Sequence, residues 1–204
     1  MSKYFVSAIG TDSGKTVVSA IISQALGADY WKPIQCGFPR DLDTVRMLVQ
    51  DPRSTFHEEQ YLLKTPASPH AAAKIDGVEV AVDHFKLPST DNNLVIEGAG
   101  GLLVPLNDDE NIVDLIIKFD AELVLVSDLY LGSINHTLLS VEALQKRNLK
   151  VKGIIFNGEE NKESESIILK RSGYNCLLNI AREDKVNPNM VGRYARKLKE
   201  KWEI

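Results

Sequence analysis

The chain has 204 residues, of which 44% are hydrophobic and 25% are charged, and its formal net charge is −4. This composition is ordinary for a globular protein, and the length predicts a single domain, residues 1–204, that buries a sizeable core. The negative charge argues against duplex nucleic acid or an anionic membrane as the main partner, and we expect neither.

Short apolar runs alternate with helical patterns along the whole chain. The predicted strands are residues 4–8, 29–34, 94–96, 122–127 and 151–156. The predicted helices are residues 15–26, 42–49, 111–119, 134–146 and 189–202. Continuous apolar strands separated by helices indicate an α/β fold, in which a mainly parallel sheet is covered by helices on both faces.

Three segments between these elements are less regular. Residues 52–88 contain four prolines, which favours an excursion over the active site rather than a second domain. Residues 97–101 are predicted to form a turn, and residues 158–166 a surface loop that enters a helix.

The cysteines and the N-terminus indicate a reducing compartment. Cys36 and Cys176 are far apart and have no metal-like spacing, so a disulfide scaffold is not expected. The apolar run before Gly10 is too short for a signal peptide, and no stretch of about 18 apolar residues is present. We therefore expect a cytoplasmic protein.

The strongest motif is residues 10–16, Gly-Thr-Asp-Ser-Gly-Lys-Thr, between a predicted strand and a predicted helix. Backbone N–H groups around Asp12, Ser13 and Gly14 would face phosphate oxygens at the helix N-terminus. Lys15 can reach the β- and γ-phosphates of ATP, and the Thr16 hydroxyl can bind Mg²⁺. The motif predicts a P-loop NTPase-type fold. The alternative is a chance Gly-Lys-Thr, and the glycine spacing is indeed one residue short of the general pattern.

Three further charged residues are expected near the same sheet edge. Glu97 follows the buried strand 94–96, where a carboxylate can hold Mg²⁺, although a solvated strand-end glutamate is the alternative. Lys32 ends the second predicted strand, and it is either a site residue or a surface lysine. Asp43 lies near the start of a predicted helix and could equally be a first-turn acid.

Five motifs in order resemble the dethiobiotin synthetase family. They are residues 10–16, 31–37 (Trp-Lys-Pro-Ile-Gln-Cys-Gly), 66–72 (Pro-Ala-Ser-Pro-His-Ala-Ala), 96–106 (Ile-Glu-Gly-Ala-Gly-Gly-Leu-Leu-Val-Pro-Leu) and 131–136 (Leu-Gly-Ser-Ile-Asn-His). In that family the P-loop begins with a small residue that corresponds to Ala8, which accounts for the short glycine spacing.

The resemblance implies ATP-dependent closure of the ureido ring of dethiobiotin from 7,8-diaminononanoate and CO₂, a step of biotin biosynthesis. One amine takes up CO₂ as a carbamate, whose oxygen attacks the γ-phosphate to give a carbamic–phosphoric anhydride. The second amine then closes the ring and releases phosphate. Such a path needs fixed cations more than a nucleophile.

The resemblance also assigns roles to residues. It implies Lys15 and Lys32 as catalytic cations, and Mg²⁺ bound by Thr16, Asp43 and Glu97. Nucleotide contacts would add Gly98, Ala99, Gly100 and Asn157 to the P-loop, and substrate contacts would come from Thr11, Cys36, Ser133 and Asn135. Ser133 and Asn135 would serve the site of a second subunit, which implies a homodimer with shared sites.

The chain departs from the family pattern at several positions. Cys36 replaces a common Ser or Thr, so a hydroxyl is not essential there. Tyr130 stands where some relatives have Lys, and Gly158 replaces a common acidic residue after Asn157. Residues 179–183 lack the expected Gly and Pro, which leaves the adenine contacts open.

Two other functions fit part of the sequence. A P-loop kinase for a small metabolite would share Lys15, Thr16 and Glu97, but it does not account for Lys32-Pro33 and Ser68-Pro69-His70 as a set. A partitioning-type ATPase switch would have a signature lysine early in its P-loop, where this chain has Ile9 to Asp12.

Overall fold

A computed structural model of the chain describes residues 1–202. Seven strands form one sheet in the order β4-β2-β6-β1-β7-β8-β9, and every neighbouring pair is parallel. These strands are β1 (Lys3–Ala8), β2 (Asp29–Trp31), β4 (Phe56–His57), β6 (Leu94–Gly101), β7 (Glu122–Asp128), β8 (Val151–Asn157) and β9 (Cys176–Ile180). A small second sheet pairs β3 (Ile34–Cys36) with β5 (Tyr61–Leu63).

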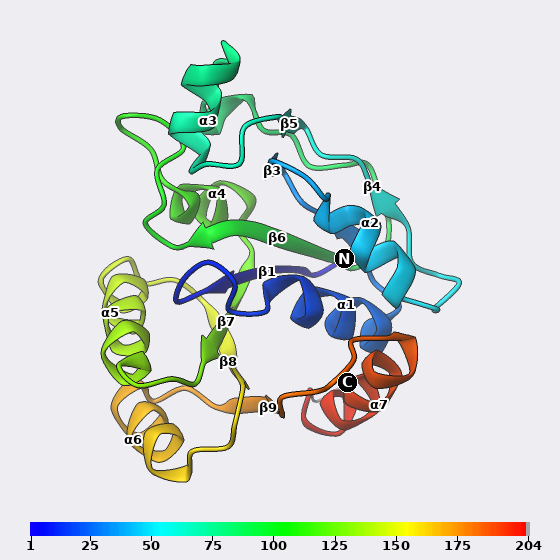
Figure 1. Cartoon of the computed structure of the whole chain (residues 1–204), viewed down its shortest axis with the longest axis vertical. Helices are drawn as coiled ribbons and strands as arrows, with labels where there is room; N and C mark the ends of the chain where they lie inside the picture. The colour runs from blue at the N-terminus through cyan, green and yellow to red at the C-terminus, as the bar shows by residue number, and fades with distance from the viewer. Residues whose placement is uncertain (203–204) are drawn as a thin grey trace.

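Helices cover both faces of the large sheet (Figure 1). One face packs on α1 (Lys15–Leu26), α2 (Asp41–Leu48) and α7 (Pro188–Lys201), and the other on α4 (Ile112–Phe119), α5 (Ser133–Lys146) and α6 (Lys162–Ser172). Neighbouring residues of β1 serve opposite cores, with Phe5 in one and Val6 in the other, as the pleat of a strand requires. The predicted doubly wound α/β fold is confirmed.

The predicted strand 29–34 is wrong as a single element. It divides at Lys32 and Pro33 into β2 of the large sheet and β3 of the small one. Pro33 has no N–H to donate to a ladder, while its carbonyl accepts hydrogen bonds from the backbone of Gln60 and Tyr61. The division leaves Lys32 at the end of β2.

The predicted turn at residues 97–101 is also wrong, because β6 continues to Gly101. The pairing with β1 shifts here, since Val6 pairs with Glu97 and Ala8 with Gly101. Gly100 has φ 66° and sits against Val104, which a side chain at this position would disturb. The strand therefore bends beside the P-loop instead of ending before it.

Residues 52–88 hold β4, β5, α3 (Pro69–Asp76) and the short 3₁₀-helix η1 (Val82–His84). In Figure 1 α3 and β5 lie beyond β6 and the tip of β3, at one end of the molecule. Within residues 1–202, the structure contains no helix with the length and apolar character needed to cross a membrane.

Candidate active site

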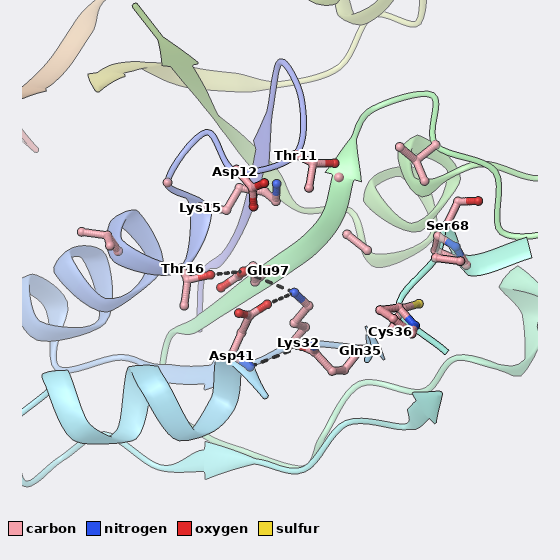
Figure 2. A pocket seen from close by; sticks show the side chains of 18 residues that line it. Thr11, Asp12, Lys15, Thr16, Lys32, Gln35, Cys36, Asp41, Ser68 and Glu97 are labelled. Carbon is pink, nitrogen blue, oxygen red and sulfur yellow. Dashed lines mark hydrogen bonds and ion pairs between the residues drawn. The ribbon is translucent and has the colours of Figure 1, made fainter. Parts of the chain in front are cut away.

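A cavity of about 710 Å³ lies at the carboxyl ends of β1, β2 and β6 (Figure 2). Four segments line it: the P-loop with the start of α1, the β2–α2 connection with Asp41, residues 66–69, and the end of β6 with Val104 beyond it. In open parallel sheets ligands bind at this edge, because loops and helix N-termini converge there. The proline-rich excursion thus reaches the cavity, as its composition predicts.

The P-loop brings a buried lysine to this cavity. Lys15 is 7% exposed, and its Nζ donates to the Gly10 carbonyl at 3.1 Å. Burial lowers the pKa of Lys15, as does the neighbouring Lys32, while Glu97 opposes the change. Gly14 opens α1 with φ 93°, a conformation that glycine adopts readily.

Glu97 is completely buried, and both of its carboxylate oxygens have partners. Oε1 accepts hydrogen bonds from Thr16 Oγ1 at 2.9 Å and from Lys32 Nζ at 3.5 Å, and Oε2 accepts one from Tyr30 Oη at 2.9 Å. Burial and the charge of Glu97 raise the pKa of Tyr30 well above its ordinary value. Figure 2 shows Thr16 and Lys32 directed at Glu97 from two different elements.

Lys32 forms ion pairs with Asp41 and Glu97. Burial by itself lowers the pKa of Lys32, but the two carboxylates outweigh it and the pKa is raised. Lys32 is therefore a fixed ammonium at the cavity wall rather than a surface lysine.

Asp41, not Asp43, is the acid of α2 that lines the cavity. The Asp43 side chain is 52% exposed and lies 3.6 Å from the guanidinium of Arg46. Two residues along a helix correspond to a turn of roughly 200°, so only one of these two acids can face the site. We therefore replace Asp43 by Asp41 in the candidate metal site.

Gln35, which was not among the predicted site residues, fixes the start of α2. Gln35 Oε1 accepts the backbone N–H of Asp41 at 3.3 Å, and its amide donates to the Gly37 carbonyl at 3.2 Å. Gln35, a buried residue of β3, thus accepts one of the free N–H groups in the first turn of α2. The N-cap residue Arg40 cannot do so, because its side chain carries no hydrogen-bond acceptor. The sequence points to this role of Gln35 only through the position of an amide side chain shortly before a predicted helix.

Other predicted residues divide between the cavity wall and the layer behind it. Thr11, Asp12, Gly14, Cys36, Ala99 and Gly100 line the cavity. Ser13 is buried in the loop, and Gly98 packs so closely on Phe5 that a side chain there would collide with the ring. Burial raises the pKa of the Cys36 thiol to about 11.

A second cavity of about 480 Å³ adjoins the first, since Asp12 and Val17 line both. Asn157 lines it and donates through Nδ2 to the Ser13 carbonyl at 3.0 Å, which ties β8 to the P-loop. Residues 180–183 form another wall, where Tyr194 Oη donates to Glu183 at 2.7 Å and accepts the Ala181 N–H at 3.1 Å. This cavity lies beside the P-loop and is large enough for a base and ribose.

Ser133 and Asn135 lie in α5, outside the walls of these two cavities. Ser133 Oγ is buried and has no hydrogen-bond partner among the described residues, and Asn135 is exposed. A third cavity of about 400 Å³ runs between α5 and β6 and is lined by Thr11, Leu103 and His136, among others. The structure thus does not bring Ser133 and Asn135 to the P-loop of their own chain.

The site offers oxygen ligands suited to Mg²⁺. Among residues 1–202, no three His, Cys, Asp or Glu side chains cluster closely enough to form a metal site by themselves. Thr16, Asp41 and Glu97 nevertheless present a hydroxyl and two carboxylates within one network. Mg²⁺ commonly takes one or two carboxylates and completes its shell with water and phosphate oxygens, so the donor set fits.

Known proteins resemble this chain in sequence and in fold. A family model described as an AAA domain matches residues 2–190. Two curated relatives carry the name ATP-dependent dethiobiotin synthetase BioD. The Cytophaga hutchinsonii protein is 55% identical and the match covers 99% of each chain, and the Christiangramia forsetii protein is 49% identical over 97% of this chain and 96% of its own.

Solved structures agree on the fold at much lower identity. The cell division ATPase MinD of Pyrococcus furiosus has a TM-score of 0.61 at 14% identity, over 100% of this chain and 99% of its own. A ParA family ATPase from Chlorobium tepidum has a TM-score of 0.54 at 11% identity, over 98% and 96%. These two support the P-loop fold alone, whereas the sequence relatives settle the family. This chain belongs to the dethiobiotin synthetase family.

Proposed function

We propose that this chain closes the ureido ring of dethiobiotin from 7,8-diaminononanoate and CO₂ while it converts ATP to ADP and phosphate. The observation that carries the proposal is the pair of buried lysines, Lys15 and Lys32, at one cavity beside a P-loop. The reaction develops negative charge on carbamate and phosphate oxygens in turn, and cations fixed in a dry site stabilise such charge. Family membership supplies the substrate class.

The nucleotide would lie across the two adjoining cavities. Backbone N–H groups of the P-loop and the N-terminus of α1 would bind the phosphates, and Lys15 would turn from the Gly10 carbonyl toward the β- and γ-phosphates. The cavity beside Asn157 and residues 180–183 would receive the base and ribose. In this arrangement the γ-phosphate points into the larger cavity.

We assign Mg²⁺ to Thr16, Asp41 and Glu97, because both carboxylates pair with Lys32 and the Thr16 hydroxyl donates to Glu97. When bound there, Mg²⁺ neutralises charge on the phosphates and helps to orient them. The Lys32 ammonium lies between the carboxylates of Asp41 and Glu97 and compensates their mutual repulsion.

The diamine would occupy the part of the larger cavity between Lys32 and residues 66–69. Lys32 would bind the carbamate oxygens and hold them toward the γ-phosphate, so that attack becomes effectively unimolecular. Thr11 and Cys36 line the surrounding wall. Because its pKa is about 11, the Cys36 thiol stays neutral and adds no charge to compete with the carbamate.

The far end of the substrate requires a different part of the protein. 7,8-Diaminononanoate has a carboxylate many ångströms from its amines, and Ser133 and Asn135 are outside both cavities of their own chain. The N-terminus of α5 offers backbone N–H groups and the exposed side chain of Asn135. We therefore propose a homodimer in which α5 of one subunit binds the carboxylate at the site of the other.

Phosphate release under selective omission tests the proposed function. A synthetase releases phosphate from ATP only when both bicarbonate and the diamine are present. A small-metabolite kinase would transfer the phosphoryl group to its substrate and form ADP without bicarbonate. An ATPase switch would release phosphate with neither bicarbonate nor the diamine. Phosphate release that continues at the full rate without bicarbonate would reject the proposal.

A further inference from the structure

Tyr30 reaches Glu97 from the neighbouring strand, beneath the cavity floor. β2 and β6 are parallel neighbours, with Tyr30 in register with Val95. Tyr30 is completely buried, and its Oη donates to Glu97 Oε2 at 2.9 Å. Tyr30 does not line the cavity, so any effect that it has on the reaction must act through another residue.

The two carboxylate oxygens of Glu97 therefore have different hydrogen-bond partners. Oε1 meets Thr16 and Lys32, the groups that belong to the cavity, while Oε2 is held by the phenol. The terminal torsion of a glutamate is broad, so a carboxylate with a single strong partner can rotate. A second hydrogen bond on the opposite oxygen restricts that rotation.

A buried carboxylate also loses its hydration, and hydrogen bonds from neighbouring groups have to replace it. Removing one donor from such a group exposes it to an unmet desolvation cost. Tyr30 supplies that donor without adding charge, whereas a lysine at the same place would compete with Mg²⁺ for Glu97.

We propose that Tyr30 is a positioning residue that fixes Glu97 so that Oε1 faces the bound metal. The proposal rests on the metal role assigned to Glu97 under the proposed function. It predicts that loss of the phenolic hydroxyl weakens use of Mg²⁺ and leaves the fold intact.

The test measures how much Mg²⁺ is needed for half-maximal binding of a non-hydrolysable ATP analogue. In Tyr30→Phe we expect this concentration to rise roughly tenfold, the effect of one hydrogen bond to a charged group. The matched control is Tyr4→Phe, because Tyr4 pairs with the same Val95 from the other side of β6 and packs on Trp202. Tyr4→Phe should leave the Mg²⁺ requirement unchanged.

A double-mutant cycle with Glu97→Gln separates this inference from the metal site itself. If Tyr30 acts through Glu97, the double variant should need no more Mg²⁺ than Glu97→Gln alone. A shift in Glu97→Gln with none in Tyr30→Phe would overturn the role of Tyr30 but keep the metal site. Additive shifts would likewise overturn it, and no shift in either variant would reject Glu97 as a metal residue.

Discussion

Two lysines and two carboxylates share the buried wall of the cavity, and their charges nearly balance. Lys32 is paired with Asp41 and Glu97, while Lys15 rests on a backbone carbonyl. An unpaired buried charge is costly, so Lys32 belongs to the resting structure and Lys15 is the cation that can turn to a ligand. Both lysines nevertheless serve the proposed reaction as cations, so the loss of either one is expected to slow it.

Lys15→Ala and Lys32→Ala should each reduce kcat by about 10²–10³, the typical cost of losing one fixed charge-stabilising group. Circular dichroism should show a retained fold, and Lys150→Ala is a suitable control because Lys150 is exposed and pairs with Asp120 at the surface. Near-normal turnover of Lys32→Ala at saturating substrate would remove Lys32 from catalysis.

The rate at which Cys36 is alkylated should depend on pH. Burial raises its pKa to about 11, so the reactive thiolate is scarce at neutral pH and increases roughly tenfold per pH unit below that value. In a Cys176→Ser background, alkylation of Cys36 should therefore accelerate steeply between pH 8 and pH 10, as judged by mass spectrometry, because both pH values lie below about 11. The diamine should slow the labelling.

Fast alkylation of Cys36 at pH 7 with full activity retained would place the thiol away from the substrate. Cys36→Ser should keep most of the activity, since the two side chains are similar in size and neither is charged here.

At the scale of elements, the first turn of α2 decides which acid serves the site. Asp41→Asn should raise the Mg²⁺ concentration needed for half-maximal activity severalfold, because it removes a charged ligand and leaves Lys32 with one carboxylate. Asp43→Asn is the matched control, with the same change on the exposed side of the same turn. If Asp43→Asn has the larger effect, the assignment of Asp41 is wrong.

The same turn illustrates what could and could not be predicted from the sequence. The P-loop, Glu97 and Lys32 follow from their places at strand ends, because parallel strands bring those ends to one edge. Asp41 and Asp43 both stand in a first turn, and sequence spacing does not reveal which side of the helix faces the cavity. That choice depends on the length and path of the 37–40 connection.

Contacts between side chains of neighbouring strands could not be predicted from the sequence either. Tyr30 reads as an ordinary buried strand residue, and its meeting with Glu97 depends on β2 lying next to β6 in the observed register. β9 was not predicted, since its five residues are short and carry Asn179 among apolar neighbours. Pro33 is plain in the sequence, but the pattern of apolar residues does not show that the chain passes there from the large sheet into the small one.

For the whole molecule, the proposed homodimer predicts that one chain does not complete its own site. Mixing Lys15→Ala chains with Asn135→Ala chains should restore activity, because the heterodimer has one site with both residues intact. Complementation requires subunit exchange, which tagged chains can verify by co-purification. Exchange without any recovery of activity would contradict the shared site.

In the proposed reaction, ATP phosphorylates a carbamate held between Lys32 and the P-loop. With bicarbonate doubly labelled with ¹³C and ¹⁸O, the enzyme should place ¹³C in the ureido carbon and one ¹⁸O in the released phosphate. That oxygen is the one through which the carbamate attacks the γ-phosphate and which leaves when the ring closes. Mass spectrometry of both products decides the point. Labelled dethiobiotin accompanied by unlabelled phosphate would contradict the proposed reaction, because water rather than carbamate would then have received the phosphoryl group.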